Sequence, residues 1–86
     1  MKEEQLLELG FERTDVSKEE SGDRPFYYFT LDFGLSRGIS FISCDDEQAK
    51  EDGWYIEIFE DPSIRFNEYE DVKDLIRVLK KGITQG

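Results

Sequence analysis

The strongest constraint on the fold is an apolar stripe near the C-terminus. Its residues fall at i, i+3, i+4 and i+7, the spacing of one helix face: Val72, Leu75, Ile76 and Leu79. Acidic residues precede the stripe and Lys80 and Lys81 end it, and both signs favour the helix dipole. Asn67 is the expected N-cap, with Glu70 reaching back to its amide, and Gly82 is the expected stop. We expect this helix to pack across one face of a sheet.

The sheet is expected from three apolar runs. The clearest strand is Phe26–Phe33 (FYYFTLDF), which is rich in the aromatic and β-branched types that suit a pleated surface. A turn with a glycine at each end, Gly34–Gly38, leads to a return strand at Ile39–Cys44. Trp54–Glu60 is the next strand, and Asp61–Pro62 is expected to stop it.

Weaker signals complete the chain. Glu3–Leu9 predicts a short helix that exists only if its leucines pack on the rest of the protein. Phe11–Val16 alternates poorly, so we expect an edge strand there, and Ser63–Phe66 adds a short extended piece at most. Ser17–Arg24 and Asp45–Gly53 are polar throughout or nearly so, and we expect both to be surface connections.

This order predicts an α+β fold in a single domain over residues 1–86. It comprises a short N-terminal helix, a three- to four-stranded antiparallel meander, and a C-terminal amphipathic helix packed on one sheet face. The chain contains seven Phe, four Tyr and one Trp. Since each buried aromatic side chain removes roughly 150–250 Å² from water, the core requires no disulfide or metal.

The net charge and the lack of long apolar runs indicate which classes of partner and which cell compartment to expect. The 21 acidic and 11 basic residues give a net charge of −10, which repels phosphate backbones and anionic lipid. We therefore expect no direct nucleic-acid or membrane binding. The opening MKEEQLLELG has no apolar run of signal-peptide length, and no stretch approaches the ~18–20 apolar residues of a membrane span. With a single cysteine, the expected location is cytoplasmic.

The sequence contains few residues of the types that usually carry out catalysis. Histidine, the commonest general base, is absent. Cys44 is followed by Asp45 and Asp46, whose negative charge disfavours a thiolate, so we interpret it as a small strand residue. A carboxylate pair such as Asp45 with Glu57 or Glu60 can serve acid–base work in principle. Fortuitous pairs are inevitable among 21 acids, and we expect no enzyme activity.

The acidic run Asp45–Asp52 raises the question of calcium, because hard cations prefer clustered oxygens. An EF-hand loop starting at Asp45 needs glycine where Lys50 stands and Asp or Asn where Ala49 stands. We therefore expect a solvated acidic segment without metal. No glycine-rich phosphate cradle is present either, so we expect no cofactor.

Apolar side chains occur on both faces of the predicted strands. Alternation places one set on the core face: Tyr27, Phe29, Leu31, Phe33, Phe41, Ile56 and Ile58. The reverse face receives Tyr28, Ile42, Tyr55 and Phe59. One C-terminal helix cannot cover both faces. Either the N-terminal helix covers the reverse face, or that face meets another chain.

Several blocks carry a resemblance: PFYYFTLDFG, ISCDDE, WYIEIFEDPSIRF and EDVKDLIRVLKKG. Together they resemble small uncharacterised acidic proteins of gut bacteria and their phages. The similarity covers most of the chain after Gly10 and rests on strand and helix patterning, so it implies no site residue and no activity. It implies a phage or mobile-element setting, where small acidic proteins often act by binding another protein.

These observations favour a small acidic protein-binding module, of an inhibitor or nucleic-acid-mimic type. The predicted apolar anchors are Tyr28, Tyr55 and Phe59, because aromatic residues dominate interface hot spots. The acids predicted to steer a basic partner are Asp45, Asp46, Glu51 and Asp52. The alternative is a structural homodimer or assembly component whose reverse face pairs with its own copy.

Overall fold

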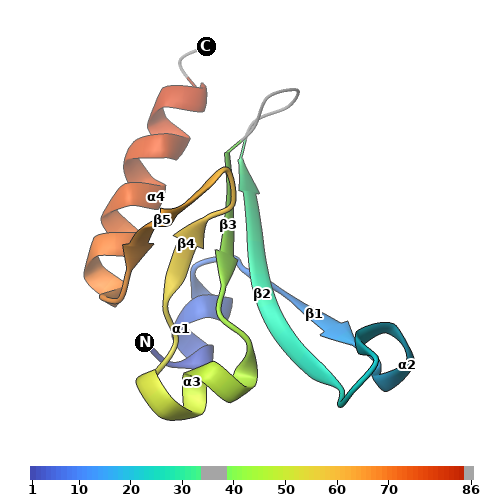
Figure 1. The fold of residues 1–86 in the computed structure, drawn as a ribbon. Coiled ribbons are helices and arrows are strands. Elements are labelled where there is room, and N and C mark those ends of the chain that lie inside the picture. The colour runs from blue at the N-terminus through green and yellow to red at the C-terminus, as the bar shows by residue number, and fades with distance from the viewer. Residues whose placement is uncertain (34–38, 85–86) are drawn as a thin grey trace.

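The computed structural model describes residues 1–33 and 39–84, which form one open sheet with helices packed against it (Figure 1). In chain order the elements are α1 (Glu3–Glu8), β1 (Glu12–Val16), α2 (Lys18–Ser21), β2 (Phe26–Phe33), β3 (Ile39–Ser43), α3 (Asp46–Asp52), β4 (Ile56–Ile58), β5 (Asp61–Phe66) and α4 (Tyr69–Thr84). The strands lie in the order β1-β2-β3-β4-β5, each antiparallel to its neighbours. The predicted α+β class and meander are confirmed, and β1 is the expected edge strand. The expected turn at Gly34–Gly38 lies outside the described residues.

The described sheet has five strands, where three or four were expected. The predicted strand Trp54–Glu60 is shorter, because β4 ends at Ile58 and the chain turns there. Asp61 and Pro62, predicted to stop a strand, instead begin β5. The register shifts between Glu57 and Ile58, which accommodates this tight return.

The hydrophobic core lies on one side of the sheet. Phe29, Phe41 and Ile56 are each at most 1% exposed. They share a cluster with Leu6 of α1 and with residues of α4, so both helices pack on the same side (Figure 1). We call this side the core face and the opposite side the reverse face. The predicted core-face residues Tyr27, Leu31 and Ile58 are partly buried against the cluster, and the side chain of Phe33 lies outside the described part.

Each of the two predicted surface connections contains a short helix that was not predicted from the sequence. Ser17 Oγ accepts from the amide of Glu20 (3.3 Å) and begins α2, and Gly22 ends it with φ 77°. Asp45 accepts from the amide of Gln48 (2.8 Å) and begins α3. Each helix has a side-chain cap but no buried residue, so capping rather than an apolar stripe defines it.

The C-terminal helix is confirmed, but both of its predicted ends were wrong. The amide of Val72 donates to the carbonyl of Glu68 (3.2 Å), so Glu68, and not Asn67, occupies the N-cap position. The helix then continues through Gly82 to Thr84. A single exposed glycine costs a helix only about 1 kcal/mol, which explains why Gly82 does not end it. The apolar stripe faces the core as predicted, with Val72 and Ile76 buried and its other members half-buried.

Candidate interaction surface

The reverse face is formed by the residues that alternate with the buried ones. Tyr28 and Thr30 flank the buried Phe29 on β2, so their side chains point away from the core. Their cross-strand neighbours follow from the register, which pairs Tyr28 with Thr14 on β1 and Thr30 with Ile42 on β3. Helix α1 packs on the core face, so it does not provide the cover for the reverse face that one alternative expected.

A groove of about 320 Å³ lies on this face. We call it the reverse-face groove, and its lining comprises Thr14, Tyr28, Thr30, Asp32, Ser40, Ile42 and Phe59. The lining comes from three adjacent strands and the turn after β4, and no helix of the described residues contributes to it. Asp32 is the one charged residue among the described residues that line it.

Phe59 is exposed, although its main chain is hydrogen-bonded to β3. The residue is 63% exposed. Its amide donates to the carbonyl of Ser40 (2.8 Å), and the amide of Ser40 donates to the carboxylate of Glu60 (3.1 Å). The turn after β4 is thereby joined to Ser40 of β3 by two hydrogen bonds, one from Phe59 and one to Glu60. The main chain that carries this aromatic wall of the groove is therefore fixed to β3.

Polar groups complete the groove. Within the described residues, the hydroxyl groups of Thr14, Thr30 and Ser40 make no hydrogen bond, so they are available to a ligand. Tyr28 and Ile42 are half-buried and supply apolar surface. Asp32 stands opposite Ser40 on the paired strands and is exposed. The arrangement offers an apolar surface beside hydroxyls and one carboxylate, which suits an apolar side chain that has a cationic neighbour.

Tyr55, predicted as an anchor, lies outside the groove lining. The guanidinium of Arg65 sits 4.0 Å from the centroid of its ring. Arg65 also donates to the carboxylate of Glu57 (3.0 Å), and this hydrogen bond raises the pKa of Arg65. Burial raises the pKa of Tyr55, which keeps the phenol neutral. Tyr55 is therefore already covered by a side chain of its own chain.

The four acids predicted to steer a partner do not line the groove. Asp45 caps α3, and the Asp46 carboxylate accepts from the amide of Tyr27 (3.2 Å). That bond satisfies the β2 backbone where β3 no longer runs beside it. Glu51 and Asp52 are exposed on α3, and Asp52 accepts from the Gln48 amide side chain. Alternation along each strand puts Thr30 and Asp32 on the same side as Tyr28, and Ser40 on the same side as Ile42. That Thr14 lies beside Tyr28 follows from the register.

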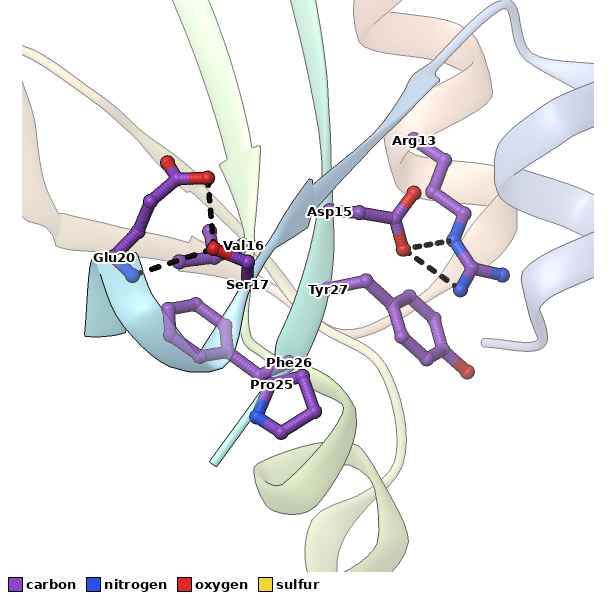
Figure 2. A pocket seen from close by; sticks show the side chains of 8 residues that line it. All are labelled: Arg13, Asp15, Val16, Ser17, Glu20, Pro25, Phe26 and Tyr27. Atoms are coloured by element: carbon purple, nitrogen blue, oxygen red, sulfur yellow. Dashed lines mark hydrogen bonds and ion pairs between the residues drawn. The ribbon is translucent and has the colours of Figure 1, made fainter. Parts of the chain in front are cut away.

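A second hollow, of about 380 Å³, lies where β1 and β2 meet α2 (Figure 2). It is lined by Arg13, Asp15, Val16, Ser17, Glu20, Pro25, Phe26 and Tyr27. The guanidinium of Arg13 bonds the Asp15 carboxylate (2.9 Å) and lies 3.7 Å from the centroid of the Tyr27 ring (Figure 2). Ser17 and Glu20 bond each other. The polar groups of this hollow are thus largely paired among themselves.

The single cysteine, Cys44, lies in the core. Cys44 is 7% exposed, and burial raises the pKa of its thiol. Within residues 1–33 and 39–84 no group of three or more His, Cys, Asp or Glu side chains is placed to hold a metal ion. Among the same residues, no helix has both the length and the apolar character that a membrane crossing requires.

The chain was compared with protein families, with curated proteins and with solved structures. No family model, no curated protein and no solved structure matches it. The resemblance to proteins of gut bacteria and their phages therefore stays a prediction.

Proposed function

We propose that this chain is a small protein-binding module that captures a basic segment of another protein in the reverse-face groove. The observation that carries the proposal is Phe59, which is 63% exposed at the wall of the groove while its main chain is hydrogen-bonded to β3 through Ser40. An exposed aromatic residue on an ordered backbone is typical of an interface hot spot, because the backbone at that position loses little conformational entropy on binding. In this role Tyr28, Ile42 and Phe59 receive an apolar side chain of the partner.

Charge gives the proposal its chemical class of partner. The chain carries a net charge of −10, and Asp32 lies in the groove lining. A lysine or arginine beside the apolar anchor of the partner would meet this carboxylate. The exposed acids Glu51 and Asp52 on α3 act at longer range, by accelerating the encounter with a positively charged protein. A partner that ordinarily binds nucleic acid has this charge, so an inhibitor that acts by mimicry is one form of the same function.

The proposal is tested by selecting binders from a random peptide library on the immobilised protein. We expect the selected peptides to combine an aromatic or long aliphatic residue with lysine or arginine. Phe59→Ala should weaken their binding by about thirtyfold or more, the effect of losing a hot spot. Labelled protein should show peptide-induced amide shifts at Thr30, Ile42 and Phe59.

Leu7→Ala is the matched control. Leu7 is 56% exposed, similar to Phe59, but it lies on α1 away from the groove. This variant should bind the selected peptides as the parent does. Peptides without basic residues, or binding that Phe59→Ala leaves unchanged, would contradict the proposal.

A further inference from the structure

The outer edge of β1 exposes backbone N–H and C=O groups. Two hydrogen bonds on the β3 side of β2 show which residues of β1 these groups belong to. The amide of Phe29 donates to Ser43 Oγ (2.8 Å), and the amide of Tyr27 donates to Asp46 Oδ1 (3.2 Å). Both acceptors lie on the β3 side, so the odd-numbered amides here point toward β3. The amide of Tyr28 therefore points toward β1, because successive backbone groups alternate in direction along a strand.

The register then assigns the two sides of β1. Tyr28 pairs with Thr14, so Thr14 turns its own N–H and C=O toward β2. Its neighbours Arg13 and Asp15 accordingly turn theirs outward. β1 is the first strand in the sheet order, and no described strand pairs with this edge. The second hollow is lined by side chains from both faces, Tyr27 and Phe26 among them, as expected for a space at the margin of a sheet (Figure 2).

The charges on this edge are self-complementary. Thr14 is the midpoint of β1, Glu12–Val16. In an antiparallel pair centred on Thr14, Arg13 of one copy stands opposite Asp15 of the second copy, and the reverse. These are also the residues whose backbone groups point outward, so they form the hydrogen-bonded pairs of the new ladder. Their side chains project from the same side of β1, where they already bond each other at 2.9 Å (Figure 2).

We propose that two copies of this chain pair antiparallel through β1, about a two-fold axis at Thr14. The register joins the backbone groups of Arg13 and Asp15 and sets unlike charges opposite each other in both symmetric positions. Opposite charges at directly facing positions favour strand pairing, and like charges oppose it. The sheet would continue without interruption from one chain into the other.

The other edge of the sheet is less suited to pairing. β5 contains Pro62, which lacks an amide proton, and the register shift at Glu57/Ile58 lies beside it. Charged side chains on an edge often prevent pairing with arbitrary strands. On β1 these charges favour one register, in which the strand pairs antiparallel with β1 of a second copy. A foreign peptide would need the same alternation of charges to fit.

The proposed pairing has a consequence for the reverse-face groove, although it does not rest on the proposed function. Facing residues of an antiparallel pair lie on the same side of the sheet. The two reverse faces would therefore point in one direction, with Thr14, a groove-lining residue, at the axis in both copies. Two grooves so arranged would bind a repeated or dimeric partner more tightly than one groove does.

Charge reversal tests the register directly. Sedimentation velocity from micromolar to millimolar concentration should show a monomer–dimer equilibrium for the parent chain, because edge pairing buries little apolar surface and is weak. Arg13→Asp alone, or Asp15→Arg alone, should weaken the dimer by about tenfold or more, since each sets like charges opposite each other twice. Mixing the two single variants should restore association as a heterodimer, and Arg13→Asp/Asp15→Arg should restore the homodimer.

Amide hydrogen exchange gives a second readout. The amides of Arg13 and Asp15 should exchange more slowly as the concentration rises, while that of Thr14, which faces β2, should not change. A parent chain that stays monomeric to millimolar concentration would overturn the proposal, as would single variants that dimerise like the parent or fail to recombine when mixed. A dimer abolished by Phe59→Ala but not by charge reversal would assign the contact to the reverse face and overturn it equally.

Discussion

The two faces of the sheet are built from alternate residues of the same strands, yet they have different surroundings. On β2, Phe29 is 1% exposed beneath the helices, while its neighbour Tyr28 lines an open groove. Both faces carry aromatic residues, so aromatic content does not separate them. The difference lies in the side chains next to the aromatic residues. On the reverse face, hydroxyl groups and one carboxylate line the same groove as the aromatic rings. On the core face, by contrast, the buried hydroxyl of Ser43 is paired with backbone groups: it accepts from the amide of Phe29 and donates to the carbonyl of Cys44. A buried hydroxyl without such partners is costly.

The largest expected effect is on the core face. Phe29→Ala should lower the free energy of unfolding by about 3–5 kcal/mol, because it removes a fully buried ring that meets Trp54 edge to face at 5.2 Å. Phe59→Ala removes the same atoms from the reverse face and serves as the comparison. Urea denaturation of both variants measures the contrast. Similar losses for the two would mean that the faces are equally buried.

A second prediction concerns which face α1 covers. Leu6 is fully buried and Leu7 is 56% exposed, although they are adjacent on the same short helix. Leu6→Ala should cost about 2–5 kcal/mol and Leu7→Ala less than about 0.5 kcal/mol. Thermal and urea denaturation of the pair provide the measurement. A large loss from Leu7→Ala would place α1 over a second apolar surface and break the distinction between the faces.

The sequence was sufficient for the features that depend on periodicity. The bounds of β2, the stripe of α4 and the separation of Phe29 from Tyr28 all follow from spacings of two or of three and four residues. The short helices α2 and α3 were missed because they bury no side chain, so no apolar period marks them. A signal was nevertheless present. Each segment begins with a capping residue that has Glu or Gln three positions on, and ends at a glycine.

The candidate site was only partly predictable, because it depends on long-range strand pairing as well as on alternation along each strand. Alternation identifies the residues that share a face with Tyr28, but not which of them the chain itself covers. Arg65 lies over Tyr55 because β5 pairs with β4, and the sequence suggested only a short extended piece there. Likewise, Asp46 satisfies a backbone amide of β2 that is distant in sequence. Such long-range pairings depend on the register of strands, which local patterns do not specify.

A smaller effect on the core side depends on pH. Burial raises the pKa of Cys44, so the folded chain holds this proton more tightly than the unfolded chain does. The resulting stability is fully present below the unfolded-state pKa of about 8.5 and is lost as the pH rises through the folded-state pKa. Burial also raises the pKa values of Tyr27 and Tyr55. The stability difference between the parent and Cys44→Ala isolates the thiol. It should shrink between about pH 7 and pH 10, and a constant difference would contradict a raised Cys44 pKa.

The smallest expected effect on stability is at the reverse face. Phe59→Ala should change the free energy of unfolding by less than about 0.5 kcal/mol, because the ring is 63% exposed and the hydrogen bonds of its turn come from the backbone and from Glu60. The same substitution is the one expected to remove most of the binding in the groove. Denaturation and peptide binding should therefore both be measured on one preparation. A core-face substitution should lower stability, whereas a reverse-face substitution should lower binding. A residue retained for stability would show the first loss, whereas a residue retained for recognition shows only the second. If Phe59→Ala destabilised the chain as Phe29→Ala is expected to do, the ring would be part of the core, and the reverse face would lose its claim to be a contact surface.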